Sequence, residues 1–190
     1  TRSVNADQLA GGSAQIKNDI DVIKKYFIQS GVLDSEITVN PATVNPVCES
    51  QGGMFYDRYG NQSCGSSRAI GYNIQQVIII ESGRVDEVAR LAQTAADEFV
   101  GQGIIFTTQN LEYYYSKLAE LRLDLLAEAT KDAQERARRI AQSTGKKIGA
   151  LQSASQGVFQ VTAKNSVEVS DYGAYDTSSL EKKITGVVRA

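Results

Sequence analysis

Histidine and tryptophan are absent from this chain of 190 residues, methionine occurs once, and proline and cysteine occur twice each. Without histidine, the chain lacks the most common general base and the most common transition-metal ligand of proteins. The serines have neither a histidine base nor a lysine at SxxK spacing, so nucleophilic catalysis has little support. We therefore predict a protein that is not an enzyme and that has no catalytic, metal or cofactor site.

Long apolar runs and an excess of one charge are also lacking. The longest strongly apolar run, 77–80, is far shorter than the ~18 residues of a membrane-spanning helix. The net charge is −2, from 20 basic and 22 acidic residues that are interleaved, as in 181–183. No basic stripe is visible, so we expect no nucleic-acid partner. A content of 42% hydrophobic and 22% charged residues is typical of a folded globular protein.

The chain begins at Thr1 rather than at methionine, and no apolar leader follows. This start is typical of a processed protein or of a shortened one, and by itself it does not decide whether a signal peptide or membrane anchor was removed. A missing segment of that kind would supply any membrane tether. Residues 1–4 and 185–190 both resemble strands that were cut before their natural ends.

Three helices are predicted from the spacing of apolar residues. In the first, the apolar residues from 16 to 27 follow one another at steps of four, three and four, which is one face of a helix. Gly31 is well placed as the left-handed residue that ends the first helix, and glycines also stop the other two. The predicted helices and their glycines are 7–30 with Gly31, 84–100 with Gly101 and Gly103, and 117–144 with Gly145.

Strands are predicted between these helices. The segment 69–81 carries apolar residues on both faces and is expected to be central in its sheet. The segment 36–47 contains both prolines, which cannot donate to a ladder, so it is predicted to be an irregular or edge strand. Further strands are predicted at 104–115, 147–163 and 182–190, with polar loops at 48–65 and 164–179.

The predicted order is β-α-β-β-α-β-α-β-β, with both terminal strands cut. Because hairpin-like neighbours interrupt the alternation of helices and strands, we predict an α+β fold with mixed or antiparallel sheets packed against three helices. The length suits a single domain over 1–190. An alternative is two small lobes, one of about 1–82 plus the C-terminal strand and one of about 83–163.

The third predicted helix has a regular ridge of small residues. Every fourth position is small, at Ala129, Ala133, Ala137, Ala141 and Gly145. Small side chains let a helix approach a sheet or another helix closely. The ridge fits packing within the chain, and it also fits a helix that docks a partner subunit.

Several segments resemble the SIMPL-domain family, in matching order and spacing. They are 126–137 with 140–141, 144–145 and 148–149, then 31–32 with 37–38, then 70–72, 113–118, 157–162 and 176–179. The resemblance implies a SIMPL-like α+β fold and an envelope or periplasmic address behind a signal or anchor. It also implies ring-like homo-oligomers in some members, and it supplies no agreed catalytic residue. The segment 48–64 departs from the family pattern and could block or create an interface.

Cys48 and Cys64 lie at the mouths of two neighbouring predicted strands, with 15 residues between them. If these strands pair as a hairpin, a disulfide across its base is geometrically plausible. Closing such a loop would stabilise the fold by about 3 kcal/mol and would fit an exported protein. Two free thiols, or a redox or metal-binding pair, are the alternatives. However, the pair lacks CxxC spacing and the four ligands of a zinc site.

Tyrosines in two predicted loops are candidates for binding. Tyr56 and Tyr59 lie in the loop between the cysteines, and Tyr172 and Tyr175 lie in the late loop. Loop tyrosines can stack on sugars, on bases or on a partner's surface. Packing at the edge of a sheet is the alternative for such residues.

We predict a non-enzymatic protein of the bacterial cell envelope, periplasmic or otherwise exported, of uncharacterised role. The expected partner is the protein itself, in a homo-oligomer that forms through sheet edges and loops. The alternative is a module that binds a small ligand or glycan through Tyr56, Tyr59, Tyr172 and Tyr175. The sequence does not identify that ligand.

Overall fold

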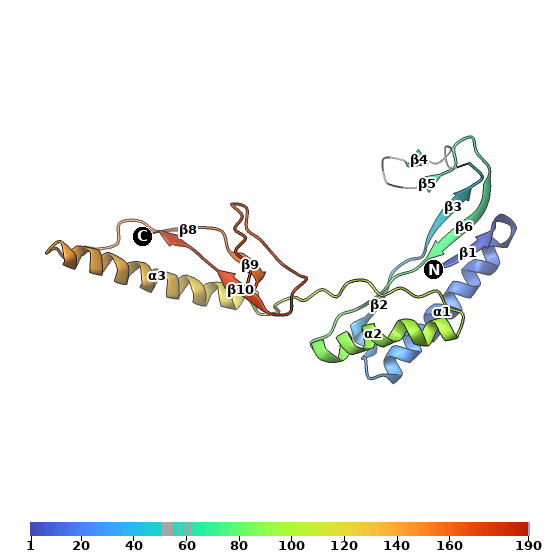
Figure 1. Cartoon of the computed structure of the whole chain (residues 1–190), viewed down its shortest axis with the longest axis horizontal. Helices are drawn as coiled ribbons and strands as arrows, with labels where there is room; N and C mark the ends of the chain where they lie inside the picture. The colour runs from blue at the N-terminus through green and yellow to red at the C-terminus, as the bar shows by residue number, and fades with distance from the viewer. Residues whose placement is uncertain (51–54, 57, 59, 61, 190) are drawn as a thin grey trace. The chain divides into compact units, whose positions relative to one another are not determined.

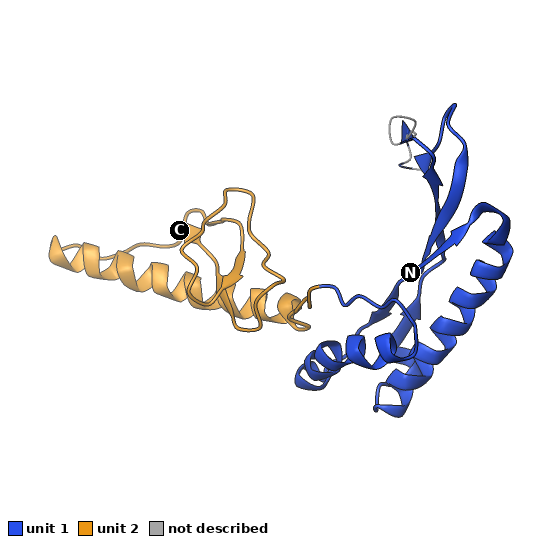
Figure 2. Ribbon diagram, turned by 45° about the vertical axis from the view of Figure 1, so that its right-hand side comes forward, with its two compact units in different colours: residues 1–109 blue, residues 110–190 orange. Residues whose placement is uncertain are grey.

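The computed structural model of the chain describes residues 1–50, 55–56, 58, 60 and 62–189. The chain has two compact units, unit 1 of Thr1–Gln109 and unit 2 of Asn110–Ala190 (Figure 2). Each unit combines helices with antiparallel sheets, and this confirms the predicted α+β class. The boundary differs from that of the expected lobes, because the C-terminal strand pairs within unit 2 rather than with residues 1–82.

Unit 1 contains two helices and seven strands among its described residues (Figure 1). The helices are α1 (Leu9–Gln29) and α2 (Val85–Gly101), with 3-10 turns at Ala6–Gln8 and Asp34–Glu36. The strands are β1 (Arg2–Asn5), β2 (Ile37–Val39), β3 (Thr43–Cys48), β4 (Phe55–Tyr56), β5 (Gln62–Ser63), β6 (Ala69–Gln75) and β7 (Ile78–Ile80). They pair antiparallel in the orders β1-β6-β3, β2-β7 and β4-β5.

The predicted segments 36–47 and 69–81 each divide into two strands. β6 is the centre of the three-stranded sheet, as expected from its two-sided apolar pattern. Pro46 lies in β3, which is an edge strand of that sheet. Among the described residues no second strand pairs with β3, so the N–H that proline lacks is not needed for a ladder hydrogen bond. The predicted loop 48–65 contains the short strands β4 and β5, which project from the end of the β3–β6 ribbon (Figure 1).

The core of unit 1 joins α1 and α2 to the β2–β7 pair. The predicted apolar face of α1 is buried, including Ile23 and Phe27. Phe99 of α2 is fully buried and lies 4.9 Å from the Phe106 ring and 5.0 Å from the Tyr26 ring, measured between centroids. Edge-to-face and tilted ring pairs of this kind add to the apolar burial. Unit 1 therefore has a core that can hold its own fold.

Away from this core, α1 packs closely against the three-stranded sheet of unit 1. Gly12 of α1 faces Val4 and Ile74, and a Cβ at this position would lie 2.7 Å from Val4 Cγ1. The Arg2 guanidinium donates to both oxygens of Asp19 at 2.5 and 2.7 Å, and the Asp19 side chain is largely buried. This paired contact anchors β1 to α1.

Unit 2 contains one helix and four short strands within the part of the chain that the structure describes. They are α3 (Leu118–Ser143), β8 (Ser155–Gln156), β9 (Gln160–Ala163), β10 (Lys182–Thr185) and β11 (Val188–Arg189). β9 pairs antiparallel with β10, and β8 pairs antiparallel with β11. The Gly157 N–H donates to the Val187 carbonyl at 2.9 Å between these pairs, so the four strands form one broken ribbon.

The strand predicted at 104–115 is not formed. Ile104 is buried in the core of unit 1, but the polar residues 107–110 carry the chain from one unit to the next without a neighbouring strand. β-branched residues such as Ile105 and Thr107 favour an extended backbone, but a strand also needs a partner for its N–H and C=O groups. The predicted strands 147–163 and 182–190 are likewise shorter than expected, because each is broken near a glycine.

Candidate functional site

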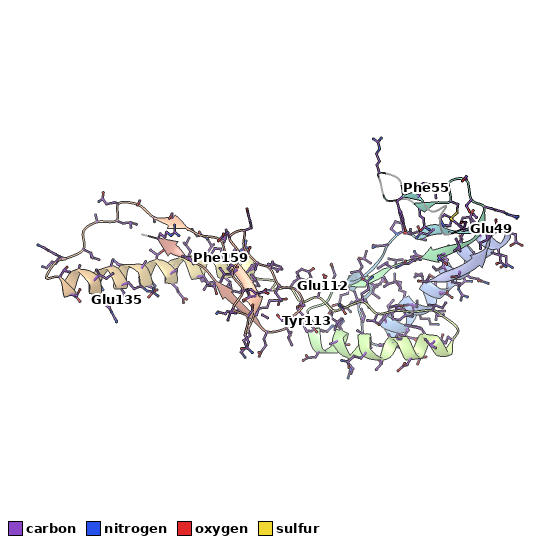
Figure 3. The ribbon with its side chains drawn as sticks, turned by 45° about the horizontal axis from the view of Figure 1, so that its top comes forward. Glu49, Phe55, Glu112, Tyr113, Glu135 and Phe159 are labelled. Atoms are coloured by element: carbon purple, nitrogen blue, oxygen red, sulfur yellow. A yellow bond between two sulfur atoms is a disulfide. The ribbon has the colours of Figure 1, made fainter. Side chains whose placement is uncertain are left out.

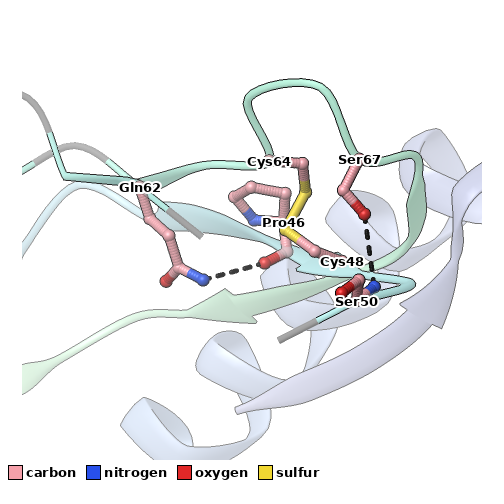
Figure 4. The surroundings of a disulfide bond; sticks show 6 residues. All are labelled: Pro46, Cys48, Ser50, Gln62, Cys64 and Ser67. Atoms are coloured by element: carbon pink, nitrogen blue, oxygen red, sulfur yellow. Dashed lines mark hydrogen bonds between the residues drawn. A yellow bond between two sulfur atoms is a disulfide. The ribbon is translucent and has the colours of Figure 1, made fainter. Parts of the chain in front are cut away.

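The disulfide between Cys48 and Cys64 closes the base of the β4–β5 hairpin. The Cα atoms of the two cysteines are 5.5 Å apart, and both side chains are buried. The Gln62 side-chain amide donates to the Pro46 carbonyl at 3.1 Å, and the Ser50 N–H donates to Ser67 Oγ at 3.2 Å (Figure 4). The bond confirms the predicted disulfide. While it is intact, neither sulfur can act as a nucleophile or as a thiolate metal ligand.

The candidate tyrosines belong to separate units. Tyr56 lies in β4 of unit 1 and is exposed beside Phe55, which Figure 3 shows at the same hairpin. Tyr59 lies outside the described residues. In unit 2, Tyr172 is 98% exposed, whereas the Tyr175 ring lies 6.3 Å from the Tyr114 ring. Each loop therefore presents its own aromatic surface.

A network of polar contacts shapes the turn between Asp176 and β10. Ser178 and Ser179 donate to the Asp176 carboxylate through both their hydroxyl and their backbone N–H groups. The side-chain hydrogen bond from Ser179, followed by that from Ser178, lowers the pKa of Asp176 well below the usual range. The buried ammonium of Lys182 donates to the carbonyls of Asp176 and Ser179 at 2.5 and 2.8 Å. The backbone of residues 174–176 also bonds to Val161, which extends the β9–β10 pair.

Unit 2 buries little apolar surface. Thirteen of the fourteen apolar residues that are buried in the described chain belong to unit 1, and Val161, 1% exposed, is the remaining one. Large apolar side chains of unit 2 are exposed on the helix, the ribbon and the loops: Leu123, Ile140, Leu151, Val158, Val167, Val169, Leu180 and Val187. Folding a unit of this size requires a buried apolar core to offset the loss of chain entropy. The exposed side chains are therefore the most prominent feature of unit 2.

α3 contributes Leu123 and Ile140 to this exposed surface, and none of its residues is buried. β11 packs against the helix, and Leu121 and Leu125 line a cavity of about 410 Å³ with Lys182 and Ile184 of β10. The Arg122 guanidinium lies 5.7 Å from the centre of the Phe159 ring. The ribbon thus covers one side of α3 and leaves the other side open.

The predicted ridge of small residues is exposed only in part. Ala129, Ala133 and Ala141 are half-buried, whereas Ala137 and Gly145 are exposed. Ala137 lies nearer to the open side of α3, where Leu123 is 70% exposed. Sequence analysis missed Leu123 and Ile140 as surface residues, because apolar residues at helical spacing are usually read as core.

The charged side chains of α3 form pairs in its C-terminal half. Arg136 bonds to Asp132 at 2.8 Å, and Arg138 and Arg139 both bond to Glu135. The hydrogen bond from Arg139, aided by the charge of both arginines, lowers the pKa of Glu135. Figure 3 labels Glu135 on this helix. By contrast, Glu120, Asp124 and Glu128 form no ion pair within the described residues. The helix thus presents unpaired acids before its midpoint and an excess of bases after it.

A second cavity of about 760 Å³ lies between the ribbon and the loop that follows β9. Its walls include Lys183 and Arg189 on the ribbon and Glu168 and Asp171 on the loop. The buried side chain of Gln160 holds the loop, since its amide donates to the Ser170 carbonyl at 2.6 Å and accepts from the Ser170 N–H at 3.2 Å. Sequence analysis did not identify these residues, because the loop shows no motif that marks a site.

Two further features bear on the kind of site that the chain can hold. Among the residues placed by the structure, no group of three or more acidic or cysteine side chains could bind a metal ion. None of the described helices combines the length and the apolar character needed to cross a bilayer.

Comparison with known proteins identifies the family. The family model of SIMPL, described as a protein of unknown function (DUF541), matches residues 2–188. The chain therefore belongs to the SIMPL family, as the resemblance indicated. A search of curated proteins finds no match to it. The family and the disulfide together fit an exported protein.

Proposed function

We propose that this member of the SIMPL family is a non-enzymatic, periplasmic protein of the bacterial cell envelope that assembles with copies of itself. The observation that carries the proposal is the open state of unit 2, where Val161 is the one fully buried apolar side chain among the described residues. Association with a second copy would bury side chains such as Leu123 and Ile140. Obligate homo-oligomers bury apolar surface in this way, and their interfaces resemble a domain core cut in half.

Chemical features of the chain support a structural role. The absence of histidine leaves hydrolysis or proton transfer without its most common catalyst. The cysteines are bonded to each other, which is the state that an oxidising compartment such as the periplasm maintains. The disulfide closes the β4–β5 hairpin of unit 1, so the exposed Phe55 and Tyr56 are held on a stapled element.

The test is the absolute mass in solution, measured by light scattering after size-exclusion chromatography over a wide range of concentration. The chain has a mass of 20.6 kDa, and we expect a discrete multimer well above this value. The measurement is repeated with a reductant, which shows whether assembly depends on the disulfide of unit 1. A clean monomer at every concentration in both conditions would refute the proposal.

A second candidate function rests on the cavity of about 760 Å³ in unit 2. Cavities of this size accommodate small molecules, and this one combines charged walls with the apolar side chains of Val158 and Val187. The fully exposed Tyr172 follows Asp171 of its wall and offers a ring for stacking on a sugar. A ligand or glycan that binds only the folded state would raise the Tm in a screen. If a broad screen leaves the Tm unchanged, this candidate fails.

A further inference from the structure

The open side of α3 has the spacing of a helix–helix contact. Successive steps of four and three residues connect Leu123, Ala127, Thr130, Gln134, Ala137 and Ala141. This alternation keeps the residues on one seam along the helix, as in a coiled coil. Leu123, Ala127, Gln134 and Ala137 are exposed, and Thr130 and Ala141 are half-buried. The side chains after Leu123 are short, so a second helix could approach closely along this seam.

The two sides of the seam differ in character. On one side, Leu126, Ala133 and Ile140 repeat every seven residues, and Ile140 is 68% exposed. On the other side, Asp124, Lys131 and Arg138 also repeat every seven residues, and all three are exposed. A seam of mostly small residues with a charged flank is an arrangement by which paired helices select their partner and their orientation.

The charge of α3 changes sign at its midpoint. The first half, 118–130, has the acids Glu120, Asp124 and Glu128 and the base Arg122, a net charge of −2. The second half, 131–143, has four bases and two acids, a net charge of +2. Two copies of α3 in parallel would place like charges opposite each other. Two antiparallel copies would place each acidic half against a basic half.

We infer that α3 packs antiparallel against α3 of a second copy along this seam. The inference rests on the proposed self-assembly and names the surface that carries it. A second copy is the occupant that the charges favour, because the helix is complementary to its own reverse. The same contact covers Leu123 and Ile140, which the ribbon of unit 2 leaves exposed. A two-fold axis across the midpoint of α3 makes the interface self-complementary, as a symmetric dimer requires.

Charge reversal provides the first test. The acid variant combines Glu120→Lys with Asp124→Lys, which changes the first half from −2 to +2. The base variant combines Lys131→Glu with Arg138→Glu, which changes the second half from +2 to −2. Each variant alone places like charges opposite each other, and we expect its dissociation constant to rise at least tenfold. The two variants mixed place +2 against −2 at both ends, and we expect the mixture to recover the assembly.

A control variant carries Asp7→Lys and Asp21→Lys, two exposed acids of unit 1 that make the same change in net charge as the acid variant. It should keep the mass of the wild-type protein. Circular dichroism at each step shows whether the helices remain folded. If the acid and base variants keep the wild-type multimer, the α3 pairing is wrong, although the proposed assembly stands. If the wild-type protein itself is a monomer, the proposed function fails.

A second measurement reads the relative orientation of the two helices. Nitroxide labels are attached in separate variants at Gln134→Cys, near the midpoint of α3, and at Gln142→Cys, near its end; both positions are exposed. With a rise of 1.5 Å per residue, antiparallel helices with coincident midpoints separate the labels at 142 by about 35 Å and bring those at 134 to within roughly 20 Å. Equal short distances at both positions would show parallel helices and overturn the inference.

Discussion

Two neighbouring glycines in α1 provide a sharp test of the packing in unit 1. Gly11 is exposed, and a Cβ added there would meet no atom within 4 Å. Gly12 is buried, and a Cβ added there would lie 2.7 Å from Val4 Cγ1 and 2.9 Å from Ile74 Cδ1. Both atoms belong to side chains of the sheet below the helix, and Ile74 is fully buried. The two positions therefore lie side by side in the same helix and differ in the atoms that surround them.

Alanine substitution separates these effects. Replacing glycine by alanine within a helix gains up to about 1 kcal/mol at either position. At Gly12, the new methyl group also overpacks the contact with Val4 and Ile74, which costs roughly 1–3 kcal/mol. We expect Gly11→Ala to raise the free energy of unfolding and Gly12→Ala to lie about 1–3 kcal/mol below it. Equal stabilities would show that α1 does not press against the sheet at this point.

The assay is urea unfolding followed by circular dichroism, with the disulfide kept intact and the protein concentration held constant. A double-mutant cycle identifies the atoms involved. Val4→Ala removes the Cγ atoms nearest to the new methyl group, so it should cost less in the Gly12→Ala protein than in the wild-type protein. A cost that is the same in both backgrounds would mean that the methyl group is accommodated elsewhere.

The remaining predictions concern the disulfide, the aromatic core and one carboxylate. Replacing Cys48 and Cys64 together by serine should lower the free energy of unfolding by about 3 kcal/mol in urea, and an unchanged midpoint would contradict the predicted role of the staple. Phe99→Ala should cost about 3–5 kcal/mol by the same assay, because it empties a fully buried site. The Asp176 pKa is lowered in the folded protein by hydrogen bonds from Ser179 and its neighbour. Its stabilising effect is therefore complete above the ordinary aspartate pKa and is lost as the pH falls below that value. Asp176→Asn should reduce the dependence of the Tm on pH between about 2 and 5, and an unaltered dependence would show that the carboxylate does not gain these bonds on folding.

Local patterns in the sequence predict much of unit 1. The steps of four, three and four that end at Phe27 correctly predict the buried face of α1, because periodicity records which side of a helix meets a core. The cysteine spacing correctly places a disulfide at the base of a hairpin, although it could not exclude two free thiols. The length of a strand is harder to predict. Ile104 and its neighbours favour an extended backbone, but whether another strand lies beside them is decided by residues far along the chain.

The same limit explains why the sequence leaves open whether α3 packs only within the chain or also against a partner subunit. Apolar residues at helical spacing form the same sequence pattern whether the helix packs against a sheet of its own chain or against another molecule. The spacing of four and three residues from Leu123 to Ala137 predicts that another surface covers this face of α3, but it does not identify that surface. In the structure, Leu121 and Leu125 face the ribbon, whereas Leu123 is exposed, so the apolar residues of one helix point to two different sides. The reversal of charge between Asp124 and Arg138 is the feature that favours an antiparallel copy of the same helix in our proposal, since such a copy places each acidic half of the helix against a basic half.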